Sequence, residues 1–87
     1  MIRKSTEDRS LDYIAIVRRE ECGDGVYAWV AEHPDLPGCM AHGDSPAEAV
    51  ENLAEARELY LRDFRERGIA PPPPGSSKIA QAIVAAG

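Results

Sequence analysis

The chain has 87 residues, enough for one small domain with a limited core. Its 15 acidic and 10 basic residues give a net charge of −5, which argues against a surface that binds nucleic-acid phosphates and suits a basic protein partner. Two cysteines are too few for a disulfide scaffold, and no apolar run suits export or a membrane span, so a cytoplasmic protein with reduced thiols is expected.

The first part of the chain predicts a charged arm followed by a β-hairpin. Residues 1–10 are mostly polar or charged and are expected to form a flexible arm. Leu11–Glu20 and Val26–His33 are rich in β-branched and aromatic residues, which favour strands, and Glu21–Gly25 supplies the glycines and aspartate of a turn. Neither strand alternates cleanly between apolar and polar residues. Both faces of the sheet are therefore expected to be covered, one by a helix and one by another subunit.

The hairpin is followed by a turn region that contains two prolines and a glycine, and we call this region the corner. Pro34 and Pro37 have no amide hydrogen to donate, so the second strand is expected to stop near His33. The run Asp-Leu-Pro-Gly predicts a turn in which Gly38 takes a backbone conformation that other residues resist. Cys39–Gly43 is then long enough for one short third strand.

The next residues carry a strong signal for the start of a helix. Ser45 can accept a hydrogen bond from the amide of Glu48, whose carboxylate can in turn accept from the amide of Ser45. Pro46 falls at the first helical position, where its missing amide hydrogen is harmless. The helix is expected to run from Pro46 to about Arg67 and to end at Gly68.

One broad apolar face is expected along this helix, interrupted by a charged residue. At about 100° per residue, the face contains Ala49, Val50, Leu53, Ala54, Ala56, Tyr60, Leu61 and Phe64. Arg57 projects into the middle of this face, and Leu59 points the opposite way. Burying an unpaired guanidinium is costly. We therefore expect Arg57 to pair with a carboxylate, from Asp12 or Glu32 on the sheet or from a second subunit, rather than to reach solvent at the edge of the face.

Beyond the helix the chain becomes rich in proline and then in alanine. Residues 71–74 are all proline and predict a stiff spacer, and residues 75–77 predict a flexible joint. The tail fits a short helix and an edge strand equally well. The predicted fold class is α+β, an antiparallel three-stranded sheet packed on one long helix, with the tail assigned as a short C-terminal strand (β-β-β-α-β). The predicted division is an arm (1–10), a domain (11–70), a Pro-rich linker (71–77) and a tail (78–87).

The sequence offers few residues for catalysis or metal binding. His33 and His42 lack a cysteine or acidic partner at ligand spacing, and Cys39 is expected to fill a small apolar gap rather than to act as a nucleophile. A magnesium-dependent nuclease needs several converging carboxylates, for which the candidates are Asp12, Glu32, Asp35, Asp44 and Glu48. The corner turn and the helix start already explain the last three. We therefore expect no enzyme activity, no metal and no cofactor.

Four stretches of the sequence together resemble the HicB-like antitoxin family. They read YIAIV, GVYAWVAEHPDLPGC, GDSPAEAVENLAEA and GIAPPPP, and they cover Tyr13 to Pro74. The resemblance rests on the joint spacing of Pro34–Cys39, Gly43–Ser45, Glu48–Ala49 and Asn52. It implies a partial ribonuclease H-like fold, with an antiparallel sheet, one long helix and a final strand, and it implies oligomers.

The same resemblance implies a partner. HicB-like antitoxins bind and cover a HicA-like toxin, a small RNA-cleaving protein with a double-stranded-RNA-binding fold. Two features depart from the family pattern. Arg57 stands where an aliphatic residue is expected, and the residues after Pro74 are too few for the helix-turn-helix or ribbon-helix-helix domain with which many members repress their own operon. DNA binding by this chain is therefore not expected.

The residues expected to contact a toxin or a second copy of the chain lie on the hairpin, the corner and the helix. They are Tyr27, Trp29, Asp35, Leu36, Pro37, Arg57 and Leu59. The aromatic pair suits either the core or an interface, where aromatic residues are enriched. Two other functions stay open: a stand-alone oligomeric module that binds protein without a toxin, and the nuclease considered above.

Overall fold

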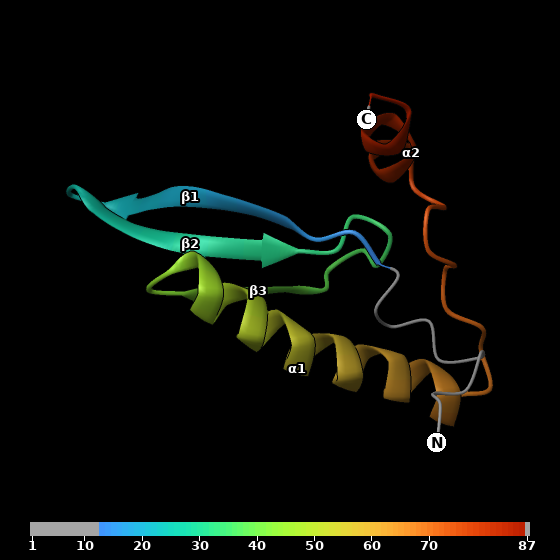
Figure 1. Ribbon diagram of the computed structural model, residues 1–87. Helices are drawn as coiled ribbons and strands as arrows, with labels where there is room; N and C mark the ends of the chain where they lie inside the picture. The colour runs from blue at the N-terminus through green and yellow to red at the C-terminus, as the bar shows by residue number, and fades with distance from the viewer. Residues whose placement is uncertain (1–12, 87) are drawn as a thin grey trace, which may run out of the picture.

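The computed structural model describes residues 13–86 and shows an α+β fold. Three antiparallel strands form one sheet in the order β1-β2-β3, and the long helix α1 runs along one face of it (Figure 1). The elements are β1 (Ile16–Gly23), β2 (Val26–Glu32), β3 (Met40–Gly43), α1 (Pro46–Glu66) and α2 (Lys78–Ala86). The predicted sheet and long helix are confirmed, whereas the arm predicted for residues 1–10 lies outside the described residues.

The first strand begins later than the sequence predicts. β1 starts at Ile16, not at Leu11, and of the residues before it the structure describes only those from Tyr13. The preceding residues contact the corner instead of β2: the carbonyl oxygen of Ile14 lies 2.9 Å from Nδ1 of His33. This contact with the corner takes the place of the longer β1–β2 hairpin that the sequence predicts.

The hairpin turn has the chemistry that the sequence predicts. Asp24 and Gly25 both have positive φ, 50° and 77°, which matches the twist of two strands joined by two residues. The register of the β1–β2 pairing shifts between Glu21 and Gly23, so Cys22 is the extra residue of a bulge. The regular part of β1 therefore ends before the turn.

The corner is closed by its own backbone. β2 ends at Glu32, and then the amide of Leu36 donates to the carbonyl of His33 at 3.0 Å and the amide of Cys39 to that of Leu36 at 2.9 Å. The amide of His33 donates across the mouth of the loop to the carbonyl of Cys39 at 3.1 Å. Gly38 has a φ of 85°, as expected for a turn that needs the left-handed region. The predicted corner is confirmed.

The start of α1 differs from the prediction in one bond. The side chain of Ser45 accepts from the amide of Glu48 at 3.1 Å, as expected of the N-cap. The carboxylate of Glu48 accepts from the amide of Asp44, however, and not from that of Ser45. The helix ends at the predicted place, with Arg67 as C-cap and Gly68 at a φ of 70°.

The third strand and the start of α1 approach each other very closely at Gly43. A Cβ atom on Gly43 would lie 2.5 Å from the amide nitrogen of Ala49. Real Cβ atoms do not approach backbone atoms this closely, so the glycine allows the helix to begin directly over the sheet.

The core lies between the sheet and α1. Its buried members are Tyr13, Ala31, Leu36, Cys39, Ala49 and Leu53, and Trp29, Ala41, Ala56, Tyr60 and Leu61 pack around them half-buried. Most of the predicted apolar face of the helix therefore faces the core. Val50 is an exception and is exposed, because the buried side of α1 centres on Ala49 and Leu53.

The tail forms a helix, so its assignment as a C-terminal strand is wrong. Ser77 caps α2: its hydroxyl accepts from the amide of Ala80 at 3.0 Å, and its carbonyl accepts from the amide of Gln81 at 3.0 Å. The Pro-rich segment carries α2 away from the sheet edges to a position beyond the β2–β3 corner (Figure 1). Neither α1 nor α2 is long and apolar enough to cross a membrane.

Candidate functional site

The corner between β2 and β3 holds the C-terminal segment. Asp35 is only 2% exposed, and its carboxylate accepts from the amide of Gly75 at 2.7 Å and from that of Ser77 at 2.9 Å. Nearby, the hydroxyl of Tyr13 donates to the carbonyl of Pro72 at 2.6 Å. The segment predicted as a stiff spacer and a flexible joint is thus hydrogen-bonded back to the domain, and Asp35 binds a segment of its own chain.

The environment of Asp35 favours its charged form. Burial by itself raises the pKa of this carboxyl, but the hydrogen bonds from Gly75 and Ser77 together outweigh burial, and the pKa lies below the ordinary 3.8. The charge of His33, when present, would act in the same direction as the hydrogen bonds. Asp35 is therefore an anion that binds backbone amides, and neither of its oxygens is free to activate water.

His33 is a buried, neutral histidine. It is 3% exposed, with Nδ1 2.9 Å from the carbonyl oxygen of Ile14 and Nε2 3.2 Å from Nη1 of Arg57. A carbonyl can only accept and a guanidinium can only donate, so Nδ1 carries the hydrogen and Nε2 is the acceptor. Burial lowers the pKa of His33 below its ordinary 6.5, and the charge of Arg57 lowers it further, against the bond to Ile14 and the charge of Asp35.

Arg57 is not paired with Glu32, so this part of the prediction is wrong. Glu32 pairs with Arg18, whose Nη1 lies 2.9 Å from its Oε1, and Asp12 lies outside the described residues. Arg57 donates to His33 instead, and its Nε is buried without a hydrogen-bond partner in the described part of the chain. Sequence reasoning missed His33 because a neutral acceptor was not considered. A carboxylate from a second subunit stays a prediction.

Cys39 lies in the core near this pair. Its thiol is buried, and burial raises the pKa while the charge of Arg57 lowers it less. The thiol therefore stays protonated at neutral pH and packs as a small apolar group. Over residues 13–86, no group of three or more His, Cys, Asp or Glu side chains is placed to hold a metal ion.

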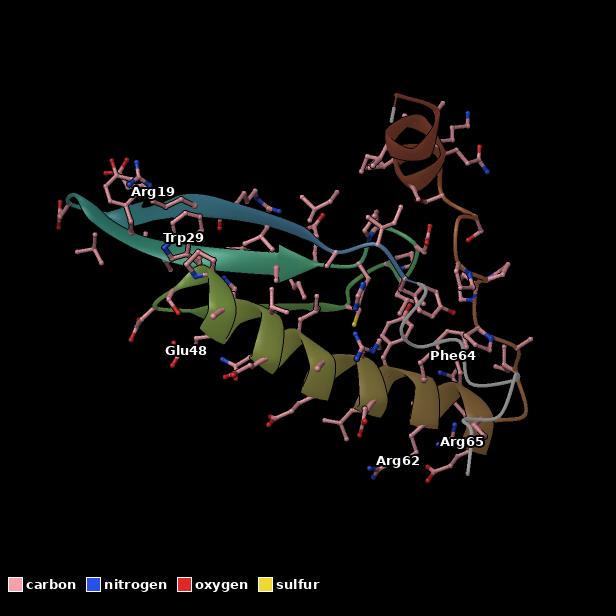
Figure 2. All side chains as sticks on the ribbon, in the orientation of Figure 1. Arg19, Trp29, Glu48, Arg62, Phe64 and Arg65 are labelled. Atoms are coloured by element: carbon pink, nitrogen blue, oxygen red, sulfur yellow. The ribbon has the colours of Figure 1, made fainter. Side chains whose placement is uncertain are left out.

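The other predicted contact residues lie on different parts of the fold. Tyr27, on β2, is 51% exposed, and Leu59, on the outer side of α1, is 60% exposed. Trp29 is half-buried and points from β2 toward the first turn of α1 (Figure 2). Pro37 is exposed at the corner and accepts from the hydroxyl of Tyr60 at 2.9 Å, whereas Leu36 is completely buried. The structure does not gather the seven residues into one surface.

Two charged surface features were not among the contact residues predicted from the sequence. The first turns of α1 expose four glutamates on the side away from the sheet, namely Glu48, Glu51, Glu55 and Glu58. Arg62 and Arg65 lie further along the same helix, next to Asp63 and Glu66, so the acidic first part of α1 is followed by a part of mixed charge (Figure 2). The second feature is the outer edge of β1, on which Arg18 and Arg19 are followed directly by Glu20 and Glu21. The order of charges in each stretch was the available signal.

Known proteins resemble this chain over most of its length. Residues 13–86 match the family described as HicB_like antitoxin of bacterial toxin-antitoxin system. A UPF0150 protein of Helicobacter pylori strain J99 is 39% identical over 56 residues, which cover 64% of this chain and 71% of that protein. The UPF0150 protein Ta0767 of Thermoplasma acidophilum is 34% identical over 56 residues, 64% of this chain and 75% of that protein. The crystal structure of TTHA0281 from Thermus thermophilus superposes with a TM-score of 0.57 at 39% identity, over 70% of this chain and 74% of that one.

Proposed function

The chain belongs to the family of HicB-like antitoxins of bacterial toxin–antitoxin systems, and we propose that it binds and neutralises a small, basic, HicA-like toxin that cleaves mRNA. The match over residues 13–86 is the observation that carries the proposal, because it spans the sheet, α1 and α2. The action proposed is steric: the antitoxin covers the toxin surface that would otherwise meet RNA. No catalytic group of the antitoxin is needed for this.

The acidic strip of α1, defined as Glu48, Glu51, Glu55 and Glu58, is the surface we propose for the toxin. All four side chains are exposed, and the chain carries a net charge of −5. A toxin that binds RNA needs a basic surface for the phosphates, and an acidic strip is complementary to such a surface. Leu59, exposed beside the strip, supplies an apolar contact.

We also propose that the chain self-associates. Strand alternation places Ile16, Val30 and Met40 on the face of the sheet turned away from α1, where Val30 is already buried but Met40 is 44% exposed. Neither α1 nor α2 packs across this face (Figure 1). A second copy covering it fits the mixed apolar pattern of both strands. We further propose that the fold is a partial ribonuclease H-like fold and that the protein is cytoplasmic. We also propose that the domain ends at residue 70 and the Pro-rich linker at residue 77.

Co-expression with the product of the neighbouring gene tests the main proposal. We expect the two proteins to copurify and the antitoxin to relieve the growth arrest that the toxin causes. The double variant Glu51→Gln/Glu55→Gln should weaken the complex, because it removes two charges from the acidic strip. The control Asp63→Asn/Glu66→Gln removes the same charge from the other end of α1 and should bind like the wild type.

Three outcomes separate the candidate functions. Failure to copurify and to relieve growth arrest would leave a stand-alone oligomeric module as the better account. Equal binding by both double variants would place the toxin elsewhere on the surface. Magnesium-dependent RNA cleavage by the isolated chain, lost in Glu32→Gln, would replace the antitoxin by a nuclease.

A further inference from the structure

Among residues 13–86, no strand pairs with the outer edge of β1. β1 has 8 residues and is a terminal strand of the sheet, since its single neighbour among the described residues is β2. Such an edge exposes a row of backbone amides and carbonyls that can pair with another strand. Its side chains are mostly exposed as well. The edge is therefore accessible over its whole length in the described structure.

The charged residues along this edge can form opposite-charge pairs with an identical strand that runs antiparallel. The middle of β1 reads Arg18-Arg19-Glu20-Glu21, two positive residues followed by two negative ones. A second β1 running antiparallel brings arginines next to glutamates, whereas a parallel second β1 in register brings like charges together. Charged side chains on an edge normally prevent pairing. Here the order of signs opposes most pairings and favours an antiparallel one with an identical strand.

The backbone and one aromatic contact favour a single register, centred on Arg19. In this register the regular pairs run from Val17 to Glu21, and Ile16 meets the bulge residue Cys22. Gly23, whose φ of 121° does not fit a regular strand, is left out. Arg18 then lies opposite Glu20 of the second copy, twice, because of the two-fold symmetry.

The two Arg19 residues face each other at the axis of such a pair, which would be unfavourable if their charges met. The guanidinium carbon of Arg19 lies 4.6 Å from the centroid of the Tyr27 ring, however, so the side chain folds back over its own β2 strand. This contact draws the charge away from the outer edge. Tyr27, one of the predicted interface residues, would thus act by holding Arg19.

Arg18 can also bind a partner on this edge. Its Nη1 is fixed by Glu32 at 2.9 Å, while its Nη2 makes only a long contact of 3.4 Å with Glu20 of the same strand. The carboxylate of Glu20 from a second copy can replace that long contact. Arg18 and Glu20 remain partly exposed in the single chain, with side-chain exposures of 41% and 50%.

We propose that two copies of this chain pair antiparallel along β1, centred on Arg19, with Arg18 of each copy opposite Glu20 of the other. The two sheets then form one continuous six-stranded sheet with a two-fold axis. This pairing through the edge of β1 is separate from the association through the sheet face proposed above, and it does not depend on the toxin.

Complementary charge reversal tests the pairing in the isolated, full-length chain. Arg18→Glu gives a chain with glutamate at both positions, and Glu20→Arg gives one with arginine at both. Each variant alone should repel its own copy, and the symmetry doubles the effect. We expect the dimer dissociation constant to rise about tenfold or more in sedimentation velocity. A mixture of the two variants should dimerise like the wild type, because every Arg–Glu pair is then restored.

Controls separate the surface from the fold and from self-association in general. Arg62→Glu and Glu66→Arg reverse charges on α1 and should leave the dimer unchanged, and circular dichroism should show all variants folded. A wild type that stays monomeric at 100 µM, taken as roughly the upper end of a useful range for weak pairs, would overturn the proposal. Wild-type dimerisation by both edge variants, or no recovery on mixing, would overturn the β1 surface while leaving self-association by another face. Neither result would bear on toxin binding.

Discussion

The corner between β2 and β3 and the hairpin of β1 and β2 use charged and polar side chains in opposite ways. In the corner, Asp35 and His33 are almost completely buried, and each binds a group far away in the chain. In the hairpin, Arg18 and Glu20 are partly exposed and bond to residues of the same two strands. Charged and polar side chains thus fix tertiary structure in one region and stay accessible in the other.

The difference teaches where substitutions should affect stability and where they should affect association. A buried carboxylate is dehydrated and depends on its hydrogen bonds to the protein. Replacing the carboxylate therefore lowers the free energy of unfolding. An exposed ion pair contributes little to stability because water and salt compete with it. Changes in the corner should therefore destabilise the chain, and changes on the hairpin should mainly alter what the chain binds.

The largest effect is expected where β3 leaves the corner region for α1. Gly43→Ala would place a Cβ 2.5 Å from the amide nitrogen of Ala49, so the backbone must move. We expect a loss of about 3 kcal/mol of unfolding free energy, at the upper end of overpacking effects. On the hairpin, Gly25→Ala meets nothing within 4 Å and suffers only from its φ of 77°, with an expected loss of about 1 kcal/mol. Urea unfolding of both variants measures the difference, and equal losses would contradict the close packing.

The next effect concerns the carboxylate that holds the tail. Asp35→Asn keeps the shape but presents one oxygen to two amides, those of Gly75 and Ser77, and leaves an N–H group facing an N–H donor. We expect a loss of about 2 kcal/mol. The matched control is Glu21→Gln on the hairpin, whose carboxylate accepts from the amide of Gly25 at 3.2 Å but is exposed. That change should cost less than about 0.5 kcal/mol.

Limited proteolysis sharpens the same prediction. Lys78 is exposed at the start of α2, directly after the amides that Asp35 binds. Trypsin should cut after Lys78 faster in Asp35→Asn than in the wild type or in Glu21→Gln, because the tail is released more often. Unchanged cleavage in Asp35→Asn would show that contacts other than the carboxylate hold the tail.

The corner also shows what the sequence can and cannot predict. Its backbone was predictable because Pro34 and Gly38 act on residues close to them in the sequence, as Ser45 and Pro46 do at the start of α1. The partners of its side chains were not. Asp35 binds an amide 40 residues further along the chain, and nothing local marks that distance. The same holds for the pairing of His33 with Arg57, which are 24 residues apart.

The tail and the strands illustrate two further limits. The sequence of residues 78–86 fits a strand as well as a helix, and the N-cap of Ser77, with the position of the segment beyond the corner, decides for the helix. The start of β1 was placed too early because the apolar pattern from Leu11 onward does not reveal that Tyr13 and Ile14 turn toward the corner. In both cases tertiary contacts override the local pattern.

A smaller effect is expected from pH, again through the corner. The pKa of His33 in the folded chain is lowered below 6.5, chiefly by burial. As pH falls below about 6.5, the unfolded chain binds a proton that the folded chain does not, so stability decreases by up to about 1.4 kcal/mol per pH unit until the folded pKa is reached. The contribution of neutral His33 to stability is fully present above pH 6.5, because 6.5 is the ordinary pKa of histidine.

Thermal unfolding between neutral and acidic pH checks this sign. His33→Gln should remove the dependence over this window, at some cost in stability, whereas His42→Gln, which changes an exposed side chain, should preserve it. The same dependence in both variants would mean that another group titrates.

The smallest change is expected at Arg57, where opposing contributions nearly cancel. The guanidinium donates to Nε2 of His33 and the side chain is half-buried, but its Nε is buried without a partner in the described structure. Arg57→Leu loses the bond to His33 and removes the unsatisfied donor, so unfolding free energy should change by less than about 1 kcal/mol. Arg57→Ala additionally loses packing and should cost about 1–2 kcal/mol more.

The two Arg57 variants also test the link to His33. Because the charge of Arg57 lowers the pKa of His33, either variant should move the acid loss of stability into a narrower window closer to pH 6.5. Denaturant unfolding at pH 7.5 and at lower pH measures both the stability and the window. If Arg57→Leu is less stable than Arg57→Ala, the lost hydrogen bond cannot explain the difference in stability, because both variants lack it. The result would mean that the site does not accommodate an apolar side chain as large as leucine. The space around the guanidinium would then be polar or closed, which would place the buried side of α1 differently from the structure.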